Sequence, residues 1–417
     1  MKVLIVNTSE NTGGAAVAAN RLCDALNNNG MKARMLVCSK QSTDITVAAC
    51  TSPKIYRWHF LWERIVIWLK NGLCRTNLFK ISIANTGTDI TKTREFQEAD
   101  IVHLHWINQG MLSLGIIKKI LQSGKPVVWT MHDMWPLTSI CHHAYECNSF
   151  TTECRECPFL KRSGRHDMSE QVFHKKQRML TGVKNLSFVA VSEWLAGKAR
   201  HSAIIGTFPI SVIPNVLSLQ QFTIVDRIDA RTTLNVEEHY VIAFGAARID
   251  DPIKGLSYLK EALTLLVTSG RFQASDIRVL FFGTLRNANE LDHFPVPCTH
   301  LGYIDDSYRL SQVYSASNAV VSSSLYETFG QTLIEAMACG CVPVSFDGSG
   351  QTDIIIHQKN GYLARRLSSE SLSDGIAWAL QCHLTPQEQR RYVVRRYSES
   401  VVAHQYQNLY NNIMNND

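Results

Sequence analysis

Short apolar segments alternate with helical ones along most of this 417-residue chain, and that alternation limits the fold more than any other feature. The pattern predicts a strand at Lys2–Asn7, a turn of small residues, a helix, and a second strand at 32–38. Near-continuous apolar strands separated by helices form a parallel sheet covered on both faces, and such sheets bind ligands at the strands' carboxyl ends. Further strands are predicted at residues 100–106, 126–133 and 186–192, with a helix at 111–122.

The alternation starts again after a polar segment. Residues 211–216 end the first series in a Pro-Asn turn, and the stretch from there to about His239 is the predicted linker. A chain of this length is too long for one compact core. We therefore expect two doubly wound α/β domains, residues 1–216 and 217–396, followed by a terminal segment at 397–417. The second series consists of strands predicted at residues 240–247, 278–283, 318–324 and 342–347 and helices predicted at 255–267 and 331–340.

The net charge of the chain and its N-terminal residues limit the classes of protein to which it can belong. Lysine and arginine exceed aspartate and glutamate by 42 − 36 = +6, a surplus too small to predict nucleic-acid binding. The N-terminal residues lack the features of a signal peptide. The most apolar later window, Ile55–Leu73, contains four charged residues and is not expected to span a bilayer. We expect a cytoplasmic protein whose 12 cysteines are buried thiols or metal ligands.

The sharpest chemical signal follows the predicted strand at 318–324. Glu327 lies in a loop, and Glu335 lies eight positions later in the helix that Gly330 opens. The first turn of a helix offers unpaired N–H groups and partial positive charge, so residues 329–332 are expected to hold a diphosphate. Carboxylates repel phosphate but accept hydrogen bonds from vicinal hydroxyls, which predicts that the two glutamates bind sugar and ribose. An ordinary turn with two surface carboxylates is the alternative.

This element, with its strings TFG and EAMACG, resembles retaining glycosyltransferase family 4 of the bacterial polysaccharide-biosynthesis type. The resemblance implies the GT-B fold, in which two Rossmann-like domains face each other across a cleft. It covers nearly the whole chain, because the terminal segment looks like the family's helix that packs back on the first domain. It implies that Glu327 binds the donor sugar and Glu335 the ribose. The implied donor-binding residues at the helix mouth are Phe329, Gly330, Gln331 and Thr332.

Two cations follow the first strand of the second series. Arg248 and Lys254 lie in a short loop, and two cations suit a leaving diphosphate. The resembled family uses an Arg and a Lys in this loop for that purpose, although the spacing here is one residue longer. With such charge available, catalysis is expected to be independent of metal. Two solvated surface cations are the alternative.

Glycines mark two further strand ends. Gly13 and Gly14 follow the first strand, where missing side chains let a backbone approach phosphate, and a plain tight turn is the alternative. They lack the spacing of dinucleotide-binding and P-loop motifs, which disfavours NAD and ATP. The resemblance implies that these glycines face the donor diphosphate. It also implies that the nucleotide base rests near Gly283 and the stretch containing Tyr303 and Ile304.

Polar residues end three strands of the first series. His132 and His105 each follow an apolar run, and Ser192 does the same further on. The resemblance implies that His132 contacts the donor sugar and that Asp133 orients it. His105, Asp133 and Ser192 are predicted to lie on the acceptor side. A purely structural role is the alternative for each.

Four cysteines lie within 17 residues, at Cys141, Cys147, Cys154 and Cys157. The last two have the spacing of zinc ligands, and four thiolates would complete a tetrahedral structural site with no open position for catalysis. His142 or His143 could replace one thiolate. The segment from 141 to 157 resembles an insertion in some bacterial relatives. Free thiols and disulfides are the alternatives to zinc.

Large apolar residues recur at helical spacing within the window Ile55–Leu73. Buried stripes are common, so we expect this one to pack into the first domain. Contact with a membrane surface is the alternative, because Arg57, Arg64 and Lys70 lie nearby. The stripe consists of Trp58, Leu61, Trp62, Ile65 and Leu69.

Together with these observations, the resemblance implies an enzyme, a retaining hexosyltransferase that uses a UDP- or GDP-sugar. The resemblance implies a glycan or lipid-linked glycan acceptor in surface polysaccharide or lipopolysaccharide synthesis, at the inner face of the cytoplasmic membrane. No cofactor is expected for catalysis, and zinc is expected only as a structural ion. A non-catalytic sugar- or nucleic-acid-binding module with a zinc knuckle is the alternative.

Overall fold

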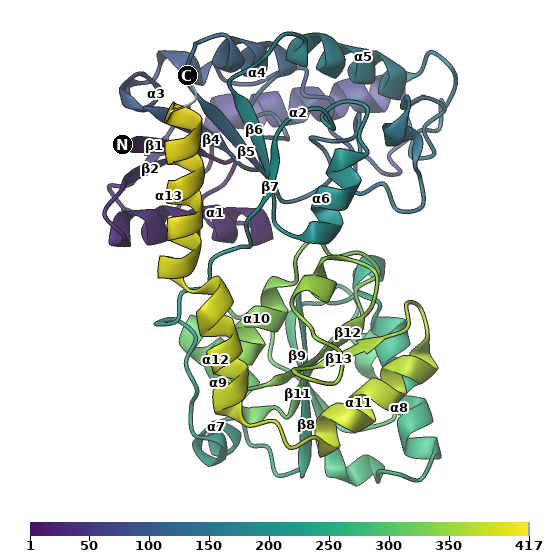
Figure 1. The fold of residues 1–417 in the computed structure, drawn as a ribbon. Coiled ribbons are helices and arrows are strands. Elements are labelled where there is room, and N and C mark those ends of the chain that lie inside the picture. The colour runs from purple at the N-terminus through teal and green to yellow at the C-terminus, as the bar shows by residue number, and fades with distance from the viewer. Residues whose placement is uncertain (416–417) are drawn as a thin grey trace. The chain divides into compact units, whose positions relative to one another are not determined.

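The computed structural model describes residues 1–415, which divide into two compact units. The first contains Met1–Val216 and the C-terminal segment from Val402, and the second contains Leu217–Val401. Figure 1 shows the strands of each unit gathered into one sheet with helices on both of its faces. Each unit therefore has the layered α/β architecture predicted from the alternation of strands and helices.

The sheet of the first unit has seven strands in the order β3-β2-β1-β4-β5-β6-β7. Every neighbouring pair is parallel, and the order reverses between β1 and β4. The five strands predicted here are confirmed as β1, β2, β4, β5 and β6. The bounds are β1 Lys2–Val6, β2 Lys32–Val37, β3 Val47–Ala49, β4 Ile101–Leu104, β5 Val127–Met131, β6 Leu186–Ala190 and β7 Ile210–Val212.

Side-chain caps begin most helices of the first unit. Ser52 accepts a hydrogen bond from the N–H of Ile55, and Ser113 does the same for Ile116. The helices are α1 Gly14–Asn28, α2 Pro53–Lys70, α3 Arg94–Glu98, α4 Leu114–Leu121, α5 Met168–Leu180, α6 Glu193–Arg200 and α13 Glu399–Asn415, with short 3-10 turns η1 Ile90–Lys92 and η2 Ser149–Thr151.

A buried series of side-chain hydrogen bonds attaches α13 to the first sheet. The Tyr410 hydroxyl lies 2.7 Å from His103 Nδ1, and His103 Nε2 lies 2.7 Å from the Thr130 hydroxyl. That hydroxyl lies 3.0 Å from the hydroxyl of Tyr406. Both tyrosines also belong to the apolar core that α1, β1 and β2 build. The C-terminal helix is therefore a component of the first unit's core.

The sheet of the second unit has six strands in the order β10-β9-β8-β11-β12-β13, again all parallel. The order reverses between β8 and β11. The four predicted strands are confirmed as β8, β9, β11 and β12. The bounds are β8 Tyr240–Arg248, β9 Ile277–Thr284, β10 Cys298–His300, β11 Ala319–Ser322, β12 Val342–Phe346 and β13 Tyr362–Ala364.

The predicted linker between the two series is wrong in part, because it contains a helix. Asp226 accepts hydrogen bonds from the N–H groups of Ile228 and Asp229 and so starts α7. The helices of this unit are α7 Arg227–Thr233, α8 Leu256–Thr268, α9 Ser307–Ala316, α10 Gln331–Ala338, α11 Ser369–Gln381 and α12 Pro386–Tyr397, with 3-10 turns η3 Pro252–Lys254, η4 Ala274–Asp276, η5 Ala288–Leu291 and η6 Gly350–Asp353.

The expectation that the apolar stripe of α2 is buried is wrong. Each of its five side chains is at least 41% exposed, and Trp58 is 59% exposed. The buried residues of α2 are instead Glu63, Arg64 and Ile67. Helical spacing identified one face of the helix correctly, but it does not say which face the fold covers. No helix among residues 1–415 is long and apolar enough to cross a membrane.

Candidate active site

The second sheet brings Lys254 and Glu327 together at the point where its strand order reverses. Lys254 lies in the loop after β8 and Glu327 in the loop after β11, and these two neighbouring strands are followed by elements that diverge. Lys254 Nζ lies 3.0 Å from Glu327 Oε2, and both side chains are about a quarter exposed, at 29% and 24%. Ligands of open parallel sheets bind at this type of position. The pair is therefore the centre of the candidate site.

The loop after β8 is held by its own carboxylates. Arg248 donates to Asp251 at 2.6 Å and lies 3.4 Å from Asp250. The other oxygen of Asp251 accepts from the N–H of Ile253 at 3.2 Å. The register of β8 against β9 shifts between Gly245 and Arg248. Both predicted cations are thus paired with carboxylates in this structure, a detail that the sequence analysis missed.

Gly255 lets the loop after β8 press against the end of β11. It has φ +66°, and an added Cβ would lie 2.1 Å from the carbonyl oxygen of Ser323. The Ser323 hydroxyl is within hydrogen-bonding distance of the carbonyls of Lys254 and Gly255, at 3.0 and 2.8 Å. This contact fixes the backbone that carries Lys254 next to the loop that carries Glu327.

The predicted helix mouth is confirmed as the start of α10. Gly330 has φ +108° and precedes the helix. Phe329 is buried and its ring meets the ring of Tyr397 edge-on, with centroids 5.8 Å apart. Gln331 Nε2 is buried with no hydrogen-bond partner among the described residues. Thr332 lies in the first turn of α10 and is part-buried. The N-terminus of this helix therefore offers a ligand its backbone N–H groups and the side-chain amide of Gln331.

The two glutamates occupy different environments. Glu335 is 9% exposed, and the hydroxyl of Tyr314 lies 3.5 Å from its Oε2. The carbonyl of Glu327 accepts from the N–H of Gly350 at 2.7 Å, and its N–H donates to the Ser349 hydroxyl at 3.3 Å. The structure thus adds Ser349 and Gly350 to the site. The small-residue string GSG after β12 is the signal that could have found them.

The residues predicted to face the nucleotide base lie in the last residues of β9 and in the segment that follows β10. Gly283 has φ +122°, and an added Cβ would lie 1.8 Å from the carbonyl oxygen of Ala246. Its N–H donates to the carbonyl of Gly302 at 2.8 Å. Tyr303, next in sequence, is 64% exposed, whereas Ile304 is buried. The base contact itself stays a prediction.

The first sheet also has candidate ligand-binding residues near the point where its strand order reverses, between β1 and β4. Gly13 is exposed, has φ +91° and has no atom within 4 Å of an added Cβ, and Gly14 begins α1. The N–H of Trp106, after β4, donates to the Asn7 side chain at 2.9 Å. The glycine turn is therefore open at the end of β1, as an approaching phosphate would require.

Two histidines at these strand ends contact each other. His105 Nδ1 lies 2.8 Å from His132 Nε2, and the buried Nε2 of His105 has no hydrogen-bond partner among the described residues. Burial lowers the pKa of His132 to about 4 and that of His105 well below its usual value. Both imidazoles are therefore neutral at pH 7 and can exchange hydrogen bonds with an uncharged hydroxyl.

Asp133 forms hydrogen bonds with its neighbours in the first unit. Its Oδ2 lies 2.6 Å from His142 Nδ1 and accepts from the Trp106 indole at 2.7 Å, while Oδ1 accepts from the N–H of Trp135 at 2.8 Å. Burial alone would raise its pKa, but His142 and these hydrogen bonds lower it to about 2. Asp133 is a buried anion that positions its neighbours. His142 is held by Asp133 and Ser82, at 2.6 and 3.0 Å, and is not directed at the cysteines.

Ser192 has a local role in this structure. Its side chain is fully buried, and its hydroxyl accepts from the N–H of Leu195 at 3.2 Å, which caps α6. The carboxyl end of β6 is thus occupied by a helix cap. The predicted contact of Ser192 with an acceptor is not tested by this geometry.

The cysteines of the 141–157 segment are free thiols in this structure, and three of the four are buried. Burial raises the pKa of Cys141, Cys154 and Cys157 to about 12 each. Within residues 1–415, no three of the four sulfurs lie within 4.8 Å of one another. Zinc binding therefore stays a prediction, and it would require the thiols to move closer together.

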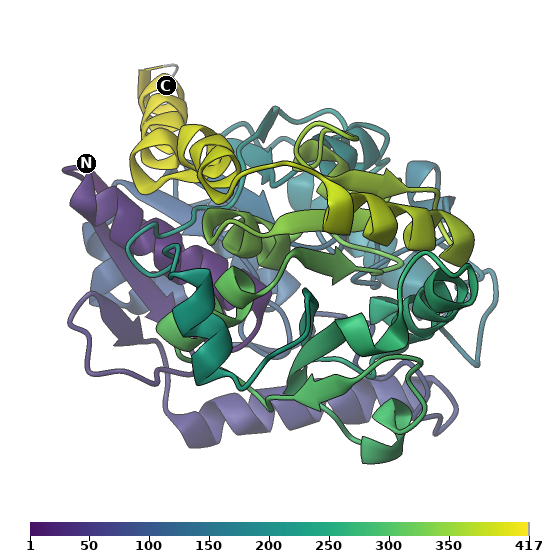
Figure 2. The ribbon, with the colours of Figure 1, turned by 90° about the horizontal axis from the view of Figure 1, so that it is seen from below.

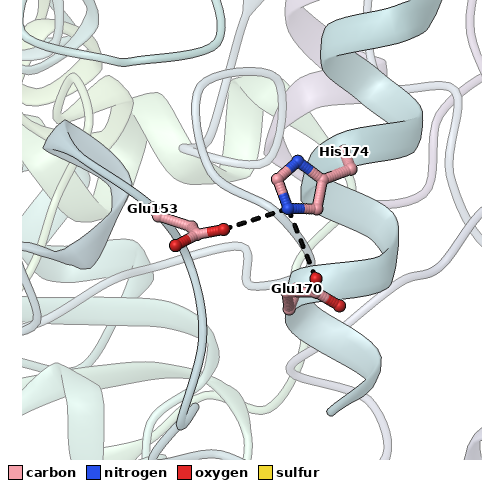
Figure 3. A group of neighbouring side chains, drawn as sticks. All are labelled: Glu153, Glu170 and His174. Atoms are coloured by element: carbon pink, nitrogen blue, oxygen red, sulfur yellow. Dashed lines mark ion pairs between the residues drawn. The ribbon is translucent and has the colours of Figure 1, made fainter. Parts of the chain in front are cut away.

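A different cluster ties this segment to α5. His174 Nε2 lies 3.0 Å from Glu153 and 3.3 Å from Glu170, and Figure 3 shows Glu153 reaching from the loop toward the helix. All three side chains are partly exposed. These contacts link the cysteine-rich loop to α5.

The fold and this site define a glycosyltransferase of the GT-B class. The structure is similar over 99% of this chain and 100% of the other to Anabaena Alr3699/HepE in complex with UDP-glucose, with a TM-score of 0.66 and 14% identity. The uncharacterized glycosyltransferase MJ1607 of Methanocaldococcus jannaschii is 24% identical, with 80% of this chain and 87% of that protein covered. A phosphatidyl-myo-inositol mannosyltransferase of Mycobacterium tuberculosis is 29% identical over 48% of this chain and 53% of that protein.

The family follows from two matches that together cover most of the chain. Residues 12–221 match the family described as Glycosyltransferase Family 4, and residues 226–396 match Glycosyl transferases group 1. The chain belongs to Glycosyltransferase Family 4, which confirms the resemblance drawn from Glu327 and Glu335.

The buried histidines generate a prediction about acid stability. Burial lowers the pKa of His103 from 6.5 to about 3, so the unfolded chain binds its proton more readily than the folded one. The stabilisation is complete above about pH 6.5 and is lost as the pH falls toward the folded-state value. Between pH 7.5 and pH 5.0 we expect His103 to contribute a loss of about 2 kcal/mol in the free energy of unfolding.

Urea unfolding at the two pH values measures this loss in the wild type and in His103→Gln. We expect the variant to show a pH-dependent loss smaller by about 2 kcal/mol. The exposed His404 of α13 offers the control His404→Gln, which should behave as the wild type. Equal pH dependence in all three proteins would contradict this explanation.

Proposed function

We propose that this glycosyltransferase transfers a hexose from a UDP- or GDP-sugar to a glycan acceptor with retention of the anomeric configuration. The observation that carries the proposal is the contact between Lys254 and Glu327 at the reversal point of the second sheet. It joins a cation suited to phosphate and a carboxylate suited to sugar hydroxyls at 3.0 Å. The similar structure of HepE was determined with UDP-glucose, which supports a nucleotide-sugar donor.

Donor binding would exchange the partners of the two cations. The diphosphate competes with Glu327 for Lys254 and with Asp251 for Arg248, and the N–H groups at Phe329, Gly330 and Gln331 add positive potential. Once released from Lys254, Glu327 can accept hydrogen bonds from the sugar. The buried Glu335 is left to accept from the ribose. The carboxylates that hold the loop in this structure thus keep the cations in place until the diphosphate arrives.

The proposed reaction requires no protein base. The bond between the anomeric carbon and the leaving phosphate oxygen breaks, and the acceptor hydroxyl forms its new bond on the same face of the sugar. Its proton passes to a phosphate oxygen of the leaving diphosphate. Lys254 and Arg248 stabilise the charge that develops on that group, which is why catalysis is proposed to be independent of metal.

The acceptor is proposed to contact the first unit. The acceptor-side residues we propose are His105, Asp133 and Ser192. His132, whose Nε2 lies 2.8 Å from His105 Nδ1, is proposed to contact the donor sugar, with Asp133 fixing the backbone beside it. A lipid-linked glycan is the acceptor class we favour, because one relative is named a phosphatidyl-myo-inositol mannosyltransferase. The proposed setting is surface polysaccharide or lipopolysaccharide synthesis in a bacterial cytoplasm, near the inner face of the membrane.

We also propose that Cys141, Cys147, Cys154 and Cys157 bind one structural zinc ion. Support comes from Lys176, which is 2% exposed and donates only to the carbonyls of Trp135 and Thr138, at 2.5 and 2.9 Å. Among the described residues it forms no ion pair with a carboxylate. Burial lowers the pKa of Lys176 to about 7, and Cys154, Cys141 and Asp133, in that order, act against this shift. A four-thiolate zinc site carries net negative charge and would compensate this buried ammonium.

Release of nucleoside diphosphate from a panel of UDP- and GDP-sugars tests the transfer proposal. We expect turnover of at least one donor and a loss of about 100-fold in kcat/KM for Glu327→Gln, which corresponds to about 2.7 kcal/mol of transition-state binding. Lys254→Met should cost a similar factor. Because neither residue is an acid or a base in this mechanism, the pH profile of the residual activity should keep its shape.

The exposed Glu237 precedes β8, at the opposite end of the sheet from Glu327, so Glu237→Gln is the matched control and should retain full activity. Absence of turnover with every donor, in a folded protein, would contradict the transfer proposal and favour a non-catalytic binding module. A Glu327→Gln variant as active as the wild type would contradict the assigned role.

Elemental analysis of the purified protein tests the zinc proposal. We expect about one zinc ion per chain, and a lower zinc content and melting temperature in Cys154→Ser, because metal binding stabilises the folded state. Cys382→Ser, outside the cluster, should retain the zinc. A metal-free wild type whose melting temperature does not respond to added zinc or chelator would refute the site.

A further inference from the structure

The α2 helix directs its charged pair inward and its large apolar side chains outward. Glu63 and Arg64 are 0% and 4% exposed and form an ion pair at 2.9 Å. A surface helix of a water-soluble protein usually has the reverse arrangement, with an apolar stripe toward the core and charges toward water. In Figure 2 this helix is the blue-purple one at the lower edge.

Hydrogen bonds to backbone groups fix the inward face of α2. Glu63 accepts from the N–H groups of Ile83 and Ala84 at 2.8 and 2.9 Å. Arg64 donates to the carbonyl of Ile81 at 3.0 Å and also to that of Leu78. These four hydrogen bonds to backbone groups anchor the buried pair, so the helix cannot rotate its apolar side into the unit without breaking them and exposing the two charges.

The outward face of α2 consists of large apolar side chains, among them two tryptophans. Trp58 and Trp62 stack with ring centroids 5.9 Å apart. Exposed apolar residues continue beyond the helix at Leu73 and Phe79, which are 59% and 62% exposed. Exposed apolar surfaces of this kind mark binding sites, and tryptophan favours the boundary between lipid and water. We define the α2 face as Ile55, Trp58, Leu61, Trp62, Ile65 and Leu69.

The exposed charges of the segment that carries the α2 face have one sign. Between residues 51 and 80 the exposed charged side chains are all basic, and the segment's one carboxylate is the buried Glu63. Anionic lipid surfaces attract basic residues next to an inserted apolar face. A second copy of the chain is a poorer occupant, because a two-fold contact would oppose these cations to one another. The basic residues are Lys54, Arg57, Lys70, Arg75 and Lys80.

We propose that the α2 face is a docking surface for a bilayer that contains anionic phospholipid. The helix lies in the plane of the interface, its tryptophans enter the boundary region, and its basic residues contact the headgroups. This inference extends the proposed function, because it names the surface on which a lipid-linked acceptor would be met. Vesicle binding is measured without donor or acceptor, so its failure can be distinguished from failure of sugar transfer.

Flotation of the full chain with vesicles tests the proposal. We expect binding to vesicles of 70% phosphatidylcholine and 30% phosphatidylglycerol, at least 10-fold weaker binding to pure phosphatidylcholine, and loss of binding in 0.5 M salt. Trp58→Ser/Trp62→Ser should weaken binding to the anionic vesicles at least 10-fold. Lys54→Glu/Arg57→Glu should do the same and should have little effect on neutral vesicles.

Matched controls separate the α2 face from exposed surface in general. Ile45 and Ile228 are 89% and 76% exposed and lie outside α2, so Ile45→Ser/Ile228→Ser should bind as the wild type. Lys359→Glu/Arg391→Glu makes the same charge change at two exposed positions elsewhere. Melting temperatures check that each variant is folded. Since the substituted α2 residues are exposed, folding should be preserved.

Quenching of tryptophan fluorescence by brominated anionic lipid supplies a second readout. We expect quenching in the wild type and most of it to be absent in Trp58→Ser/Trp62→Ser. Three results would overturn the proposal: no flotation with anionic vesicles, flotation equal in the α2 variants and their controls, or a dimer in light scattering that the tryptophan substitutions dissociate. The last result would assign the face to a second copy.

Discussion

The parallel arrangement of strands is the constraint on which the rest of this structure depends. It brings every strand's carboxyl end to one edge, and the reversal of strand order makes the loops of two neighbouring strands diverge there. In the second sheet those loops carry Lys254 and Glu327, which meet at 3.0 Å although they are 73 positions apart. Gly255 keeps the two loops in contact because its missing Cβ leaves room for the carbonyl of Ser323. Position in the fold, more than any unusual residue, gives these groups their chemistry.

The first unit uses the same edge in a different way. The ends of β4 and β5 are followed by the neutral His105 and His132 instead of cations, and burial is what keeps them neutral. The hydrogen-bonded chain from His103 to Tyr410 places part of the C-terminal helix in this core. One unit thus presents fixed charge suited to phosphate, whereas the other presents uncharged hydrogen-bonding groups suited to hydroxyls. This difference is why we propose that the donor binds mainly to the second unit and that the acceptor contacts the first.

Much of the fold could be predicted from the sequence, because strands buried on both faces are apolar throughout and are separated by regular helices. Lys254 and Glu327 could be found because each follows such a strand. The local sequence does not show which face of a helix the rest of the protein covers. The helical period therefore identified the residues of the α2 face, but we wrongly expected that face to lie in the core. Ser349 and Gly350 left a local signal in the string GSG, but their contact with Glu327 depends on the fold. The pairing of Arg248 with Asp250 and Asp251 likewise became visible only in the structure. The helix α7 was missed because one capping aspartate starts it within a polar stretch.

The central claim is that a nucleoside diphosphate binds between the loop after β8 and the mouth of α10. Hydrogen exchange of the full chain, read by mass spectrometry with and without saturating UDP or GDP, tests it most directly. We predict slower exchange in residues 248–255 and 327–335, with little change in β2 or α7. Unchanged exchange in both segments with both nucleotides, or protection confined to the first unit, would contradict it.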